Sequence, residues 1–243
     1  TEIGSRLGIS LELALIAAVF HMLNHATFKA SLFMATGIVD HETGTRDLKR
    51  LSGLRLVMPI TAILATVGAG AMAGVPLLNG FLSKEMFFEE SIVVGGSVGM
   101  QILLPAIATL AGLFSVAYSA RFIYEVFFGP PATNLPRVPL EPGLMLVPSA
   151  LLVAACVLVG ALPAITIGPL LSTAGEGFVG ARMSEYELAV WHGFTPALLM
   201  SLIALAGGVA FYIYLYVRGR TLVEAPLLSR LDSKRMFDIV NVA

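Results

Sequence analysis

The chain has 243 residues, of which 57% are hydrophobic and 13% are charged, and its formal net charge is −1. Its mean hydropathy is +0.86. Soluble domains carry about 25% charged residues, so this composition argues against a water-soluble enzyme and indicates an integral membrane protein. The near-neutral charge, without a long run of basic residues, argues against a nucleic-acid-binding protein. The lone cysteine, Cys156, lies in an apolar stretch and is predicted to be a small core residue.

Five apolar stretches are long enough to cross a bilayer, which takes roughly 20 helical residues. They are 11–39, 56–88, 101–128, 143–171 and 191–217. The sequence therefore predicts an all-α integral membrane protein with about five transmembrane helices. The second stretch is too long for one straight crossing and contains Pro76, which cannot donate a hydrogen bond to the carbonyl of Met72. We expect a break near Gly74–Gly80, another partner for that carbonyl, and a cavity enclosed by protein beside the break.

The two ends of the sequence suggest a piece of a longer protein. It opens on Thr1 rather than Met and reaches its first apolar stretch without the basic segment of a signal peptide. Residues 222–243, which mix leucines with charged side chains after Pro226, predict the start of an amphipathic helix.

Basic residues outside the apolar stretches predict the orientation in the membrane. Most lie in the loops after the first and third stretches and in the C-terminal segment: Arg46, Lys49, Arg50, Arg55, Arg137, Arg218, Arg220, Arg230, Lys234 and Arg235. The opposite side holds Arg6 and Arg182. This distribution places the C-terminus in the cytoplasm. Arg121 is predicted to pair locally with Glu125, four residues later.

Three titratable residues follow one another at helical spacing in the first stretch. His21, His25 and Lys29 recur every four residues, which places them along one stripe of a helix with neighbours about 6 Å apart. Such groups are costly against lipid and should face protein or water. Lys29 is roughly 15 Å from the nearer end of the stretch, too far for its side chain to reach the surface. One histidine alone could equally be a core residue, but the set favours proton transfer.

Lys84 forms the second candidate site. It follows the expected break in the segment Phe81-Leu-Ser-Lys84-Glu85. A lysine beside the free carbonyls of an unwound turn is a natural proton site. The alternative, which the sequence leaves open, is that this segment lies at the outer surface and Lys84 pairs with a neighbouring glutamate.

Other patterns are weaker. Gly70 and Gly74 predict a close contact between helices. The glycines around them lie inside an apolar helix at the wrong spacing for a dinucleotide-binding loop, so we expect no cofactor. Asp40-His41-Glu42 is interpreted as part of a solvated loop rather than a metal site, and no metal is expected.

Two segments resemble a known family. The run His21-Met-Leu-Asn-His25-Ala-Thr-Phe-Lys29 is similar to the proton-channel helix of the antiporter-like subunits shared by respiratory complex I and Mrp-type cation/proton antiporters, and Gly80-Phe-Leu-Ser-Lys84-Glu85 is similar to the broken helix that follows it. The runs 40–47 and 188–194 most resemble the A-type member among the Mrp subunits. The resemblance covers about 11–220.

The resemblance implies roles for four residues. Lys29 would be the central lysine of a half-channel, His21 and His25 its histidine relay, and Lys84 the lysine toward the exit. The family builds each proton-translocating unit from two inverted repeats, and the first repeat's glutamate–lysine pair is absent from this sequence.

The resemblance also implies a division of the chain and a set of partners. Residues 1–130 would be the closing helices of the second repeat, 131–221 further transmembrane helices, and 222–243 the start of a lateral helix. The chain would belong to a multisubunit antiporter of the bacterial plasma membrane that exchanges protons for Na⁺ or a similar cation. Two alternatives stay open: a proton-pumping subunit of an NADH:quinone oxidoreductase, and a structural subunit whose stripe only holds helices together.

Overall fold

The computed structural model of the chain describes residues 2–48, 50–93, 98–133, 135–179, 188, 191 and 193–222. These residues form helices and no β-strand, which confirms the all-α prediction. The helices are α1 (Glu2–Thr43), η1 (Leu54–Leu56), α2 (Pro59–Ala73), α3 (Asn79–Val93), α4 (Val98–Ile123), η2 (Tyr124–Phe128), α5 (Leu146–Ala161), α6 (Pro163–Thr166), α7 (Gly168–Val179) and α8 (Pro196–Leu222). The expected amphipathic segment after Leu222 lies outside the described residues, as do Lys49, Arg182, Arg230, Lys234 and Arg235.

Three helical segments are long and apolar enough to cross a membrane: Leu13–Thr43, Val98–Phe128 and Pro196–Arg218. They correspond to the first, third and fifth predicted stretches. Two shorter apolar helices, Pro59–Ala73 and Leu146–Ala161, begin the second and fourth. The helix break predicted in the second stretch is confirmed, since α2 ends at Ala73 and α3 begins at Asn79.

Proline explains two of the predicted boundaries that differ from the structure. The fourth helix ends at Ala161 because Leu162, with φ −132° and ψ 56°, precedes Pro163, and the residue before a proline is disfavoured in the helical conformation. The last helix begins at Pro196, where a proline's fixed φ suits the first turn. The Thr195 hydroxyl oxygen accepts a hydrogen bond from the Leu198 amide at 3.1 Å and caps that turn.

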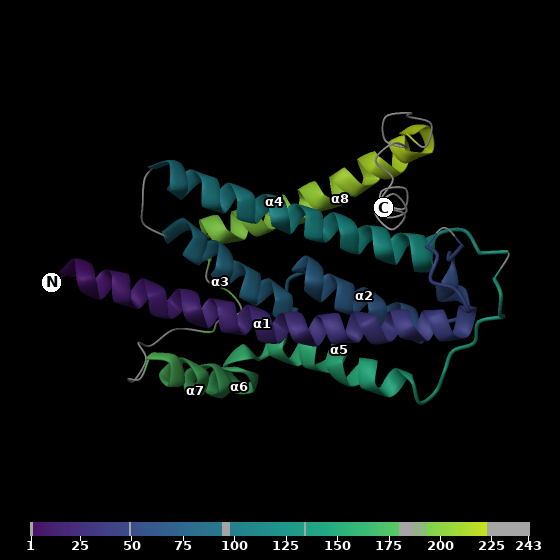
Figure 1. Cartoon of the computed structure of the whole chain (residues 1–243), viewed down its shortest axis with the longest axis horizontal. Helices are drawn as coiled ribbons and strands as arrows, with labels where there is room; N and C mark the ends of the chain where they lie inside the picture. The colour runs from purple at the N-terminus through teal and green to yellow at the C-terminus, as the bar shows by residue number, and fades with distance from the viewer. Residues whose placement is uncertain are drawn as a thin grey trace, which may run out of the picture.

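The long helix α1 runs through the molecule (Figure 1), with α5 along one side and α2 and α3 along another, and α4 packs against α2, α3 and α8. The loops 44–58 and 129–145 meet at one end. There the amide of Arg137 donates to the carbonyl of Thr43 and that of Ala132 to the carbonyl of Ser52, both at 3.2 Å. The described basic residues of these loops, Arg46, Arg50, Arg55 and Arg137, therefore gather at one end of the helices.

A glutamate from the second of these loops holds the start of α2. The carboxylate of Glu141 accepts hydrogen bonds from the amides of Ile60 and Thr61, at 2.8 and 3.1 Å, and from the Thr61 hydroxyl. The first amides of a helix have no partner within it, so Glu141 satisfies the amides of Ile60 and Thr61, which the helix itself leaves without an acceptor. The loop thereby fixes the position of α2.

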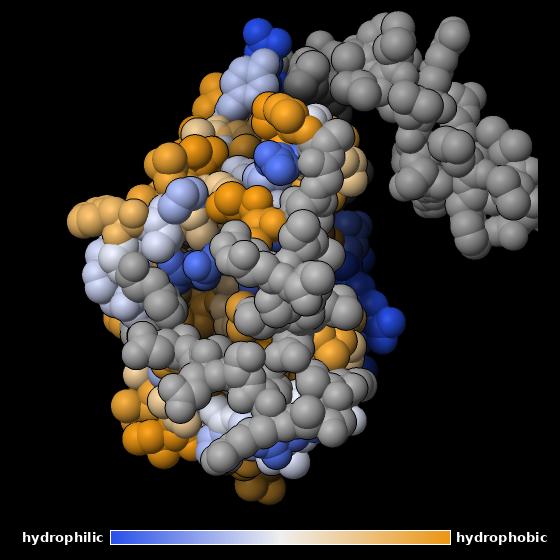
Figure 2. Space-filling view, turned by 90° about the vertical axis from the view of Figure 1, so that its left-hand side faces the viewer, coloured by the Kyte–Doolittle hydropathy of each residue, from blue (hydrophilic) through white to orange (hydrophobic). Residues whose placement is uncertain are grey.

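The core is built where α1 meets its neighbours. Phe20 and Phe81 pack α1 against α3, and Phe28 and Met72 pack α1 against α2. Cys156 of α5 is fully buried in the same cluster as Phe28, which confirms its assignment as a core residue. The outer surface is rich in exposed apolar side chains (Figure 2), which suits helices that meet lipid.

Of two smaller sequence expectations, the first is confirmed in part and the second is wrong. Gly74, the left-handed residue that ends α2 with φ +85°, lies close to α3, because a Cβ there would be 3.0 Å from the Lys84 side chain, whereas a Cβ at Gly70 would meet Leu78 and Val75 of the turn. The segment Asp40-His41-Glu42 is not in a loop but forms the last turn of α1, which continues to Thr43 before Gly44 turns the chain at φ +71°.

Candidate functional site

The site begins at the break between α2 and α3. Gly74 ends α2 with a positive φ, which a residue with a side chain would adopt only under strain. Pro76 follows without an amide hydrogen, and α3 starts close against the end of α2, because a Cβ at Gly80 would overlap the carbonyl of Ala71. The carbonyls of Gly70 and Ala71 still accept from main-chain amides of the turn, while those of Met72 and Ala73 accept from side chains of α3 and α4.

Lys84 occupies this position. Its ammonium donates to the carbonyl of Met72 at 2.7 Å and of Ala73 at 3.0 Å, and lies 3.5 Å from the hydroxyl of Ser115 on α4. That hydroxyl also donates to the carbonyl of Met72, at 3.2 Å. The expectation that this carbonyl needs another partner is confirmed. The half-buried ammonium matches a lysine at the break rather than one paired with a glutamate at the outer surface.

The first histidine of the α1 stripe contacts the same element. Nδ1 of His21 lies 3.1 Å from the hydroxyl of Ser83, the residue before Lys84. One turn further along α1, the buried side chain of Asn24 donates to the carbonyl of Asn79 at 3.0 Å and accepts from its side-chain amide at 3.1 Å. These bonds fix the stripe side of α1 against the first turns of α3.

The other two residues of the stripe lie farther from the break. The ring of His25 is 6.1 Å from that of His21, as the spacing predicted, and packs edge-on against Phe28 at 5.3 Å. The ammonium of Lys29 lies 5.4 Å from the centre of the Tyr118 ring on α4, beside a hollow of about 90 Å³. His25 is exposed and Lys29 half-buried, so the described residues leave part of the stripe open.

Both lysines therefore meet α4. Ser115 contacts Lys84 and Tyr118 contacts Lys29, and the two α4 residues are one helical turn apart. Sequence reasoning missed both of them. The signal that could have indicated them is a polar pair at helical spacing inside an apolar stretch. Sequence reasoning also gave no role to Ser83, although it lies in the segment Phe81-Leu-Ser-Lys84-Glu85 that was already singled out.

Arg121 behaves as predicted. Its Nε lies 3.1 Å from the carboxylate of Glu125, four residues later on the same helix, and its side chain is exposed. Within the described ranges, no three histidine, cysteine, aspartate or glutamate side chains are placed to hold a metal ion together.

Residues 5–111 match the model of the NADH:quinone oxidoreductase/Mrp antiporter transmembrane family. The chain is also 52% identical, over 97% of its length, to the A/B subunit of a probable K⁺/H⁺ antiporter of Rhizobium meliloti. The chain belongs to this antiporter-like family. It is 40% identical over 217 residues, 83% of its length, to the A1 subunit of a Na⁺/H⁺ antiporter of Staphylococcus saprophyticus.

A solved structure gives the same answer for the fold. The chain superposes on a chain of the Mrp complex from Dietzia sp. DQ12-45-1b with a TM-score of 0.71 and 33% identity, over 94% of its own length. It spans 24% and 27% of the two antiporter subunits and 25% of the structural neighbour. The resemblance predicted from the residue runs is thereby confirmed, and the chain is a membrane protein that corresponds to about a quarter of these relatives.

Proposed function

We propose that this chain is part of an ion-translocating subunit of a multisubunit antiporter in the bacterial plasma membrane, exchanging protons for a monovalent cation. The relatives are named as Na⁺/H⁺ and K⁺/H⁺ antiporter subunits, so either cation fits. The subunit is a secondary transporter without a cofactor, and its partners are the other subunits of the complex. The basic loops and the C-terminus face the cytoplasm, which labelling of Arg55→Cys from one side of the membrane would test.

We propose that four residues of the chain move the protons: Lys29, His25, His21 and Lys84. The observation that carries this proposal is the position of the Lys84 ammonium at the break. A charged lysine has three N–H donors, and three oxygens surround this one. When Lys84 loses its proton, the Ser115 hydroxyl can turn from the Met72 carbonyl and donate to the free amine. Both protonation states then keep hydrogen-bonded partners.

The histidines supply a path between the lysines. His21 is within hydrogen-bond distance of Ser83, the residue before Lys84, and its ring centre lies 6.1 Å from that of His25, a gap that one water could bridge. Lys29 lies one turn beyond His25. A proton gained by one lysine disfavours the charged form of the other through Coulomb repulsion, which is strong in an interior of low dielectric constant.

The test is cation-induced proton movement in everted vesicles that carry the full-length complex. Sodium and potassium are assayed separately, and assembly is matched by native gel. Lys29→Ala should abolish exchange, and near-normal exchange would overturn the proposal. Arg121→Gln, which removes an exposed charge that pairs within its own helix, is the control and should stay close to wild type.

The second candidate is a proton-pumping subunit of an NADH:quinone oxidoreductase, because the matching family includes that class. In that case the purified complex would contain flavin and iron–sulfur proteins and absorb visible light. Vesicles would move protons on addition of NADH and show no cation-dependent exchange. A purely structural role would instead show Lys29→Ala losing the assembled complex before any change in transport.

A further inference from the structure

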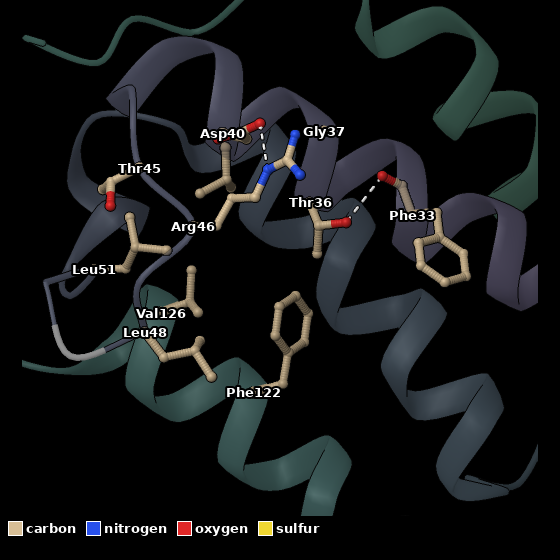
Figure 3. Close-up of a pocket in the computed structure, with 11 residues that line it drawn as sticks. Phe33, Thr36, Gly37, Asp40, Thr45, Arg46, Leu48, Leu51, Phe122 and Val126 are labelled. Atoms are coloured by element: carbon tan, nitrogen blue, oxygen red, sulfur yellow. Dashed lines mark hydrogen bonds and ion pairs between the residues drawn. The ribbon is translucent and has the colours of Figure 1, made fainter. Parts of the chain in front are cut away.

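A continuous groove runs along α1 and α4 from Lys29 to the loop end of the molecule. The hollow beside Lys29 and a larger one of about 500 Å³ share three lining residues: Phe33, Thr36 and Phe122. Figure 3 shows the larger hollow, with Phe122 of α4 and Val126 of η2 on one side and the end of α1 on the other. The groove thus connects a proposed proton-transfer residue with the end that carries the basic loops.

Polar groups stand at both ends of the groove and near its middle. Lys29, Thr36 and Asp40 are seven and four residues apart, a spacing that puts them on one face of α1, and Lys29 and Asp40 are about 16 Å apart along the axis. The Thr36 hydroxyl donates to the carbonyl of Phe33 at 2.9 Å. Its oxygen lone pairs stay available to a water in the groove.

An ion pair closes the outer end. Nε of Arg46 lies 2.8 Å from the carboxylate of Asp40, and the Arg46 side chain is exposed (Figure 3). Two nearby groups are engaged elsewhere: His41 pairs with Glu42 at 2.9 Å, and Arg137 donates to the carbonyl of His41. On the other side of the groove, Phe122 and Val126 are apolar and Tyr118 carries a hydroxyl. Among the described residues that line the larger hollow, Arg46 is the basic side chain that faces Asp40.

Between its ends the groove is lined mostly by apolar side chains. Besides the aromatic rings of Phe33 and Phe122, they include Leu48, Leu51 and Val126. The larger hollow, at about 500 Å³, has room for several waters. A passage with apolar walls and charged ends fills with water or empties according to the charge at those ends, which is how hydrophobic constrictions gate.

We propose that this groove carries protons between Lys29 and the loop end, with Asp40 as the proton-accepting group at the mouth and Arg46 as its gate. The inference rests on the proposed function and extends it by a route and two residues. A hydronium ion gives its proton to the Asp40 carboxylate, which weakens the pairing with Arg46. The proton passes through water beside Thr36 to the neutral amine of Lys29, forming the ammonium, and the Asp40 carboxylate pairs with Arg46 again.

The first test compares Asp40→Asn with Glu42→Gln in the full-length complex in everted vesicles. Glu42 is a matched control, because it is an acid of the same helix turn that pairs with His41 and does not line the groove. We expect Asp40→Asn to slow exchange at least tenfold and Glu42→Gln to match wild type. Arg46→Gln should change the rate of exchange as well, because it removes the side chain that closes the mouth of the groove.

These results separate the route from the proposed function. If Lys29→Ala abolishes exchange while Asp40→Asn behaves like Glu42→Gln, the route is wrong and the proposed function stands. If Lys29→Ala exchanges normally, the proposed function fails first. Exchange in Arg46→Gln at the rate of wild type would overturn the role of the ion pair as a gate.

A second test does not depend on transport. Thr36→Cys should react with a membrane-impermeant methanethiosulfonate, since a thiolate forms only where water reaches. Met34→Cys is the control, because Met34 lies on the same helix, is 40% exposed and does not line the groove. Equal labelling of the two positions in the assembled complex would overturn a hydrated groove.

Discussion

The two lysines of this chain are held in different ways. Lys84 lies at a helix break and donates to two main-chain carbonyls, with a serine from a third helix beside it. Lys29 lies on the unbroken helix α1, and its described contact is the face of the Tyr118 ring at 5.4 Å. The backbone carbonyls fix the position of the Lys84 ammonium, which has little freedom to move. The contact of Lys29 leaves its ammonium free to turn toward His25 on one side or the groove on the other.

The largest effect is expected from a substitution that disrupts the helix packing around Lys84. Gly80→Ala adds a Cβ that overlaps the main-chain carbonyl of Ala71, where no flexible side chain can yield. The cost should exceed the roughly 1–3 kcal/mol typical of overpacking, so the assembled complex should be lost on a native gel. Gly177→Ala is the control, since a Cβ there meets nothing within 4 Å. Normal assembly of Gly80→Ala would show that the two helices are not so closely packed.

A smaller effect is expected at Ser115, which links the break to α4. Ser115→Ala leaves the two carbonyls as the partners of Lys84 and removes a hydrogen bond worth about 1 kcal/mol. The melting temperature of the complex should therefore fall slightly, and the rate of exchange should fall several-fold. Ser119→Ala, one turn along, removes a hydroxyl bonded within its own helix and should exchange normally. Equal exchange in the two variants would show that the Ser115 hydroxyl has no part in transfer at Lys84.

The smallest effect is expected from substitutions of Tyr118, which show how this ring acts on Lys29. Tyr118→Phe keeps the ring face and should change exchange less than twofold. Tyr118→Leu removes a cation–π contact worth roughly 0.5–1 kcal/mol at exposed sites, so exchange should change about two- to fivefold. The initial rate in matched vesicles measures both. A severe loss in Tyr118→Phe would mean that the hydroxyl, rather than the ring, acts on Lys29.

The same contrast shows how far the sequence alone could reach. Pro76 without an amide hydrogen predicts an unsatisfied carbonyl at Met72, and the structure confirms this. That Lys84 and Ser115 satisfy it could not be predicted, because they lie 12 and 43 residues away and meet it only through the packing of α3 and α4. The helical period predicts the stripe from His21 to Lys29. It says nothing of Tyr118, nor of the groove, since neither is a property of α1 alone.

Sequence patterns mislead where the same residues suit two structures. Small residues four apart suit a close helix contact, and Gly74 does lie close to Lys84 of α3, yet it also ends α2 with a positive φ shortly before Pro76. The polar run 40–42 looks like a loop, yet α1 continues through it, stopped only by Gly44. In both cases the residues downstream decide the structure.

The contacts of Glu141 with the start of α2 mean that this helix is held at both ends. Three hydrogen bonds tie its first turn to the loop, while its other end is held by the Lys84 ammonium and the Ser115 hydroxyl. A helix of 15 residues is about 22 Å long. A loss of the contacts at Lys84 would loosen the end of α2 at the break first, because the three hydrogen bonds to Glu141 would still hold the other end against the loop. The turn between α2 and α3 would therefore respond to events at Lys84 before the loop does.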